Sequence, residues 1–216
     1  MNPAASDAIA SHHYYDRDCA SMAVRLLPSE YFVSTTGTVI TTVLGSCVAA
    51  CLLDADAGVA GMNRFMLPDA DTGDHVHAEA MRYGGYAMDV LVREMMQRGA
   101  RRAKLQAKLF GGGAVLANMT TLNIGDRNSD FALRYLRAEG ITVTAQDLRG
   151  PSARRVCFFG ATGRAVVKKL RAHSDLSAVQ AVEGELLRKA ALPATASARP
   201  PPVYSFLAER PRSAAQ

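Results

Sequence analysis

The stretch VITTVLGSCVAACLLD, residues 39–54, decides the fold of this 216-residue chain. Residues 39–44 are rich in β-branched side chains and residues 48–53 form a second apolar run, so both predict buried β-strands. Only the small segment Gly45-Ser46-Cys47 separates the two runs. The sequence therefore predicts two successive strands joined by a small, flexible turn that carries a cysteine.

Further strands and two helices are predicted around this stretch. Apolar side chains at helical spacing predict helices over residues 79–98 and from Ser129 or Asp130 to Glu139. Strands outnumber helices, which predicts an α+β or mixed α/β domain with helices covering a sheet. Strands or extended apolar segments are predicted at residues 23–27, 31–36, 59–67, 105–110, 141–145, 155–159 and 164–170.

The two ends of the chain differ from its middle. Residues 1–20 are polar and carry no periodic pattern, which predicts a flexible N-terminal arm. Residues 21–172 contain the predicted strands and helices and form one domain, because a chain of this length that is 49% hydrophobic can bury one sizeable core. Residues 173–216 predict a helix at 176–191, followed by a disordered tail rich in Pro and Ala.

The composition argues against several classes of protein. The formal net charge is +5, but the Lys and Arg residues are scattered without the interleaved aromatic side chains of a nucleic-acid platform. Binding of nucleic acid through residues 174–216 is an alternative that rests on this charge alone. No run approaches the ~20 apolar residues of a membrane span, and the N-terminus lacks the pattern of a secretory signal. We therefore expect a cytoplasmic protein with free thiols.

No cofactor or metal site is predicted. Cys47 and Cys51 are spaced C-x3-C, but no second Cys or His pair at ligand spacing accompanies them, which argues against zinc. Gly111-Gly112-Gly113 matches neither a P-loop nor a dinucleotide fingerprint and favours a strand-end bend or a close backbone approach. The polar segment 123–128 precedes a predicted helix and is typical of a cap that braces a loop.

Cys47 is the main candidate for chemistry. A thiol at a sharp turn can act as a nucleophile, since nearby backbone N–H groups can face a developing oxyanion. Most free cysteines are instead inert buried side chains, and the residues alone favour that interpretation. His75 and His77 lie in a predicted loop from which they could reach a site, although loop histidines are usually only solvated.

Seven blocks of the sequence together resemble the chemoreceptor glutamine deamidase family, CheD, of bacterial chemotaxis. Each block alone is weak, but they occur in the order that the family has. The resemblance implies an α/β (mixed α+β) single domain with mixed β-sheet layers flanked by helices, as in toxin deamidases. The blocks are LPSEY (27–31), TVLGSCV (42–48), GMNRFMLP (61–68), RYG (82–84), AKLFGG (107–112), NIGDRN (123–128) and TGR (162–164).

The resemblance also implies a function. Members of this family are cofactor-free cysteine hydrolases of the protein-glutamine glutaminase type. They convert glutamine side chains of methyl-accepting chemotaxis receptors to glutamate and release ammonia. Some relatives also hydrolyse receptor glutamyl methyl esters, and some bind a CheC-type phosphatase. The expected partners of this chain are therefore the cytoplasmic portions of chemoreceptors and a CheC-type phosphatase.

By matching positions, the resemblance places Cys47 on the family's nucleophile and Thr41 or Thr42 near its site threonine. The family's catalytic histidine belongs in the block that holds Arg64 here. Arginine cannot exchange protons usefully, but its charge can favour a thiolate. One hypothesis is an enzyme in which Arg64 holds the thiolate while His75, His77 or water transfers protons. The alternative is a catalytically impaired relative that binds receptors or a phosphatase.

Overall fold

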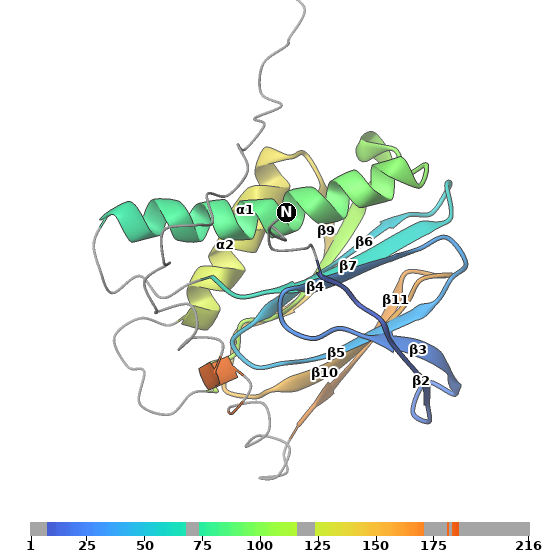
Figure 1. The fold of residues 1–216 in the computed structure, drawn as a ribbon, viewed down its shortest axis with the longest axis horizontal. Coiled ribbons are helices and arrows are strands. Elements are labelled where there is room, and N and C mark those ends of the chain that lie inside the picture. Colours follow the sequence, from blue (N-terminus) through green and yellow to red (C-terminus); the bar gives the residue numbers. More distant parts are fainter. Residues whose placement is uncertain (1–7, 68–73, 116–123, 171–180, 182, 186–216) are drawn as a thin grey trace, which may run out of the picture.

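The computed structural model of the protein describes residues 8–67, 74–115, 124–170, 181 and 183–185. Within these residues the strands form two sheets (Figure 1). The six-stranded sheet has the order β1 (Ala8–Ile9), β4 (Glu30–Ser34), β7 (Val59–Phe65), β6 (Val48–Asp54), β8 (Gln106–Gly111), β9 (Thr142–Leu148). The five-stranded sheet has the order β11 (Arg164–Lys169), β10 (Arg154–Phe159), β5 (Val39–Leu44), β3 (Ser21–Arg25), β2 (His12–Asp16).

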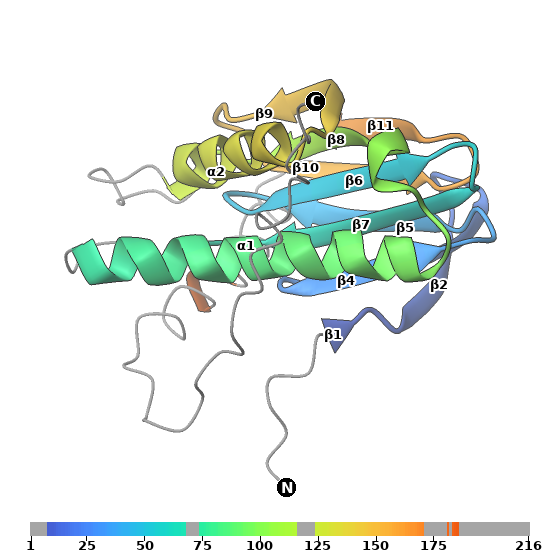
Figure 2. The same cartoon turned by 90° about the horizontal axis from the view of Figure 1, so that it is seen from above.

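The elements form three layers. Helices α1 (Asp74–Gln97) and α2 (Ile124–Ala138) cover one face of the six-stranded sheet, and the five-stranded sheet packs against its other face (Figures 1 and 2). A short 3-10 helix, η1 (Arg102–Lys104), leads into β8. Both sheets are mixed, since β1–β4, β8–β9 and β3–β5 pair in parallel and the other pairs are antiparallel. The predicted mixed α+β single domain is confirmed.

Alternation along β6 divides the core into two parts. Val48, Ala50 and Leu52 face the helices and belong to the larger cluster of buried side chains. Ala49 and Cys51 face the five-stranded sheet and belong to the cluster between the sheets. Successive side chains of a strand point to opposite faces, so a strand buried on both faces is apolar along its length, as residues 48–53 of β6 are before the strand ends at Asp54.

The decisive stretch folds into the two predicted strands, but these lie in different sheets. Residues 39–44 form β5 in the five-stranded sheet, and residues 48–54 form β6 in the six-stranded sheet. The segment Gly45-Ser46-Cys47 therefore carries the chain from one layer to the other. The predicted strands at residues 155–159 and 164–170 also form, as β10 and β11, and residues 160–163 join them as a hairpin.

The structure differs from the prediction near the N-terminus. Within the predicted arm, residues 8–9 and 12–16 form β1 and β2, and β2 pairs with β3 at the sheet edge. The Tyr14 hydroxyl lies 2.8 Å from Thr41 Oγ1, which ties β2 to β5. Alternation over five largely exposed residues is too short a pattern to stand out in the sequence.

The helices begin earlier than predicted. Helix α1 starts at Asp74, so the prediction that His75 and His77 lie in a loop is wrong. Helix α2 starts at Ile124 because the polar segment expected before the helix forms its first turns. Residues 181 and 183–185 are helical within the predicted helix 176–191. The rest of that helix and the predicted disordered tail lie outside the described residues. No helix in the described part of the chain is long and apolar enough to span a bilayer.

Candidate active site

Three consecutive glycines, Gly111, Gly112 and Gly113, pack against the backbone of the Cys47 turn. The N–H of Gly112 donates to the Cys47 carbonyl at 2.8 Å, and the N–H of Gly113 donates to the Gly45 carbonyl at 2.7 Å. Gly111 has a φ of +111°, and a Cβ placed on it would lie 2.1 Å from the Cys47 carbonyl oxygen. A residue with a side chain could not adopt this arrangement without displacing the turn. The predicted close backbone approach at these glycines is confirmed.

Asn128 of α2 fixes the turn from the helix side. Its Nδ2 donates to the Ser46 carbonyl at 2.7 Å, and its Oδ1 accepts the N–H of Leu67 at 2.9 Å. The side chain is fully buried. Asn128 thus connects the turn that follows β5 to the end of β7, and the predicted bracing role of the polar segment falls on this residue.

Arg64 lies beside Cys47. It pairs with Ala49 across β6 and β7, so its side chain points toward the five-stranded sheet, where Cys47 also lies. Its Nη2 is 3.6 Å from Cys47 Sγ. Only 5% of the Arg64 surface is exposed, and its buried Nε has no hydrogen-bond partner within the described residues. A desolvated cation therefore faces the thiol.

Glu183 is a site residue that the sequence did not reveal. One carboxylate oxygen, Oε1, accepts the N–H groups of Gly45 at 2.9 Å and Cys47 at 3.3 Å. The other, Oε2, accepts the N–H of Ser46 at 2.7 Å and its hydroxyl at 2.8 Å. Arg64 Nη2 is 3.4 Å from Oε1. The carboxylate is fully buried, and the fragment that carries it is orange-red in Figure 1.

These neighbours set the protonation state of the thiol. Burial raises the pKa of Cys47 to about 12; the Arg64 charge opposes this rise, and the charge and hydrogen bond of Glu183 add to it. Desolvation disfavours a thiolate, and a single cation that is shared with a carboxylate does not offset it. Cys47 is therefore a neutral thiol at neutral pH in this arrangement.

The two threonines face opposite sides of β5. Thr42 points between the sheets, with Ile40 and Leu44, and its hydroxyl donates to the Leu26 carbonyl at 2.9 Å. Thr41 points to the outer face, where its Oγ1 lies 2.8 Å from the Tyr14 hydroxyl. The hydrogen bonds of both threonines therefore involve residues other than Cys47.

The two histidines are not brought to the thiol by any described contact. His75 and His77 lie in the first turns of α1, which packs on the face of the six-stranded sheet opposite to Arg64 and Cys47. Their side chains lie outside the described ones. The charged side chains that act on Cys47 within the described residues are Arg64 and Glu183.

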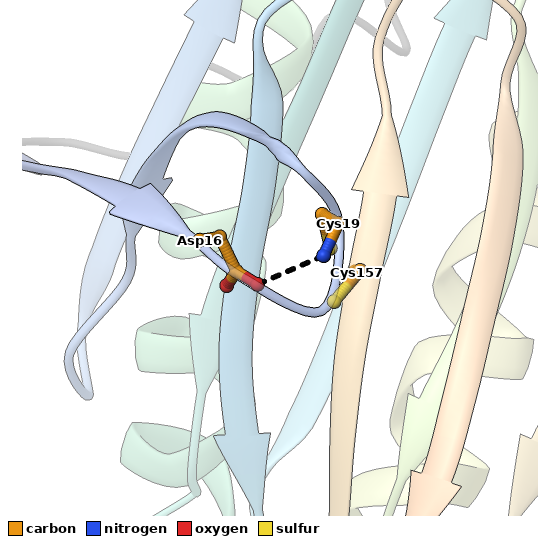
Figure 3. A group of neighbouring side chains, drawn as sticks. All are labelled: Asp16, Cys19 and Cys157. Carbon is orange, nitrogen blue, oxygen red and sulfur yellow. Dashed lines mark hydrogen bonds between the residues drawn. The ribbon is translucent and has the colours of Figure 1, made fainter.

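A second group of potential ligands lies on the outer face of the five-stranded sheet (Figure 3). Ligand atoms of Asp16, Cys19 and Cys157 lie within 4.8 Å of one another. The Asp16 carboxylate already accepts the Cys19 N–H at 3.1 Å and pairs with Arg155. Burial raises the pKa of Cys157 to about 12, so its thiol is protonated at neutral pH. These bonds explain the group as a connection between the β2–β3 hairpin and β10.

Comparison with known proteins places this chain in a family. The family model described as CheD chemotactic sensory transduction matches residues 66–169. A protein of Cupriavidus pinatubonensis named "Probable chemoreceptor glutamine deamidase CheD" is 55% identical over 199 residues, which cover 91% of this chain and 92% of that protein. An identically named protein of Cupriavidus metallidurans is 53% identical, over 91% of this chain and 90% of that protein. Another, of Burkholderia vietnamiensis, is 51% identical, over 94% of this chain and 82% of that protein.

Among solved structures, the hypothetical protein YfiH of Bacillus licheniformis shares a TM-score of 0.34 at 10% identity, over 54% of this chain and 49% of that chain. This likeness is too small to bear on the fold. The curated relatives are far more similar and extend over nearly the whole chain. The family expected from the sequence blocks is confirmed, and the chain belongs to the CheD family.

Proposed function

We propose that this chain is a chemoreceptor glutamine deamidase. It hydrolyses glutamine side chains in the cytoplasmic portions of methyl-accepting chemotaxis receptors to glutamate and ammonia. The observation that carries the proposal is the convergence on the Cys47 turn of a buried cation, Arg64, and three backbone N–H groups. The names of the relatives support it. The proposal includes the cytoplasm as its location and a CheC-type phosphatase as a further partner.

The reaction proceeds in two steps. The Cys47 thiolate attacks the carboxamide carbon of the glutamine, forming a C–S bond and an oxyanion. The N–H groups of Gly45, Ser46 and Cys47 donate to that oxyanion. The C–N bond then breaks and ammonia leaves after gaining a proton. Water hydrolyses the thioester, which yields glutamate and regenerates the thiol.

Arg64 acts as a charge rather than as a proton carrier. A guanidinium beside the sulfur lowers the thiol pKa and stabilises the thiolate. Its Nε, which has no hydrogen-bond partner among the described residues, is available to a substrate oxygen. Because arginine does not release protons near neutral pH, the leaving ammonia takes its proton from solvent, to which the thiol proton was released when the thiolate formed. We therefore propose a working but slow enzyme.

The test is conversion of a chemoreceptor cytoplasmic fragment, followed by mass spectrometry as a gain of about one dalton per deamidated glutamine. The wild-type protein should convert specific glutamines, and Cys47→Ala should not. Arg64→His should raise the rate by up to about 10²-fold, because a histidine supplies general acid–base catalysis. Cys51→Ala is the matched control: this buried thiol lies on the same sheet face and its loss should leave conversion intact. Absence of conversion by the wild type would contradict the proposal and indicate an impaired relative.

A further inference from the structure

Glu183 occupies the position that the proposed reaction reserves for the substrate. Its carboxylate accepts the N–H groups of Gly45, Ser46 and Cys47, with the longest of these bonds at 3.3 Å. A glutamate side chain is also the product of glutamine deamidation. From this coincidence we propose that Glu183 is an intramolecular product mimic, which binds in the active site in competition with receptor glutamine. This inference rests on the proposed function.

The contacts are those of a built binding site. Both carboxylate oxygens are used, and together they accept three backbone N–H groups and the Ser46 hydroxyl. Arg64 provides the counter-charge, with Nη2 at 3.4 Å from Oε1. Glu183 is fully buried and Arg64 is 5% exposed. A buried carboxylate is stable only when charge-assisted hydrogen bonds and a counter-charge compensate for its loss of water. The groups around Glu183 provide both.

Occupation by Glu183 and turnover exclude each other. The N–H groups that would stabilise the oxyanion already bind the carboxylate, so no substrate carbonyl can reach them. Cys47 is fully buried while Glu183 is bound, and both that burial and the Glu183 charge keep its thiol protonated. Departure of the Glu183 side chain would leave Arg64 as the charge next to the sulfur. The same movement therefore opens the site and favours the thiolate.

A different role would make Glu183 the general base in place of the missing histidine. A base must leave the oxyanion donors free while it takes a proton. Here both oxygens accept the N–H groups of the turn instead. The geometry therefore favours a bound product mimic, and the two roles predict opposite effects of removing the carboxylate.

Glu183→Gln provides a direct test, because it converts the mimic into an intramolecular substrate. The Cys47 thiolate attacks the new carboxamide, ammonia leaves, and water hydrolyses the thioester to restore glutamate at position 183. Peptide mass spectrometry of the full-length variant should show residue 183 gaining about one dalton over time. The double variant Glu183→Gln, Cys47→Ala should retain glutamine. Retention of glutamine at 183 with Cys47 intact, in a preparation that converts receptor glutamine, would overturn the inference.

Glu183→Ala gives a second, independent readout. Alkylation of Cys47 by iodoacetamide, measured by peptide mapping, should become about tenfold faster or more, as expected when a minor open state of 10% or less becomes the major one. Deamidation of a receptor fragment should rise by a similar factor. Glu185→Ala, an exposed glutamate on the same fragment, is the matched control and should behave as the wild type does.

The outcomes separate the inference from the proposed function. Unchanged alkylation in Glu183→Ala would overturn the inference, even if the receptor is deamidated normally. Loss of receptor deamidation in Glu183→Ala would also overturn it and would support a general base. If no variant converts the receptor while alkylation of Cys47 accelerates, the bound Glu183 is supported and the proposed substrate is wrong.

Discussion

Asn128 is the side chain that connects helix α2 to the Cys47 turn. Its amide satisfies two buried backbone groups at once, the Ser46 carbonyl and the Leu67 N–H. An amide side chain carries an N–H donor and a carbonyl acceptor on the same carbon atom, which lets Asn128 bond to both backbone groups at once. The residue therefore acts as a positioning residue for Cys47 and not as a group that contacts the substrate.

Replacement of Asn128 by Ala should lower both stability and activity. The two backbone groups would remain buried without partners, which costs about 1–3 kcal/mol. Urea unfolding should measure that loss, and the deamidation rate should fall because the Cys47 turn loses its connection to α2. Asp130→Ala, in an exposed ion pair with Arg149, is the control and should change stability by less than about 0.5 kcal/mol. Equal stabilities of the two variants would argue against this role.

At the residue scale, the sequence singled out Cys47 and Arg64 as candidates, which the structure brings together, but it did not single out Glu183. The first two lie in blocks whose order resembles the family, and the β6–β7 register explains why residues 17 positions apart meet. Glu183 lies more than 130 positions from the turn, in a segment with no motif. Only the folded chain brings a distant carboxylate to three N–H groups, because backbone donors leave no trace in the sequence.

Two neighbouring glycines in helix α1 differ in their surroundings: one is closely packed and the other faces open space. Gly84 lies where α1 meets α2: a Cβ there would be 2.5 Å from Leu67 Cδ2 and 2.7 Å from the Phe131 ring. Gly85 faces open space, with nothing within 4 Å. The first glycine permits close approach of the two helices, and the second only weakens the helix.

This contrast predicts opposite effects of the same substitution. Gly84→Ala should destabilise the protein by about 1–3 kcal/mol, since the methyl group overpacks the contact between helices. Gly85→Ala should stabilise it by about 1 kcal/mol, through helix propensity alone. Urea denaturation of both variants measures the difference, and each serves as the control for the other. A destabilising Gly85→Ala would show that helix propensity does not govern this position.

At the element scale, strands buried on both faces were the easiest to predict. The runs at residues 39–44 and 48–53 agree with β5 and β6 to within one residue. Strand β2 was missed because its side chains are mostly exposed and its partner β3 supplies the pairing. The start of α2 was missed because Gly125 and Asn128 serve packing and bonding rather than helix propensity. Residues of this kind weaken the helix pattern in the sequence wherever two backbone segments must pack closely.

The whole molecule places Cys47 where the chain crosses between the two sheets. The Cys47 turn is one of the places where the chain crosses from one sheet to the other. Cys47 belongs to the cluster of buried side chains between the sheets, so the packing that buries this part of the core also buries the thiol. Cys51 and Cys157 are buried as well, and burial raises the pKa of each. The fold thus favours the protonated state of its thiols, and folding stability must depend on pH where unfolded thiols ionise.

Cys47 makes a measurable contribution to that dependence. Its pKa is raised from 9.0 to about 12, so above pH 9 the unfolded chain loses the thiol proton while the folded protein retains it. The contribution is therefore complete below pH 9 and is lost as pH rises toward 12. The free energy of unfolding should fall by about 1.4 kcal/mol per pH unit on account of this one group.

Comparison of the wild type with Cys47→Ala isolates this contribution, because Cys157 and the other groups titrate in both proteins. From about pH 10 to about pH 11, the stability of the wild type relative to the variant should fall by about 1.4 kcal/mol per pH unit. Urea denaturation at several pH values measures the two curves. Parallel curves would mean that the thiol ionises equally in the folded and unfolded chains. The layer crossing would then not desolvate Cys47, and Glu183 and Arg64 would face a thiol that is open to water.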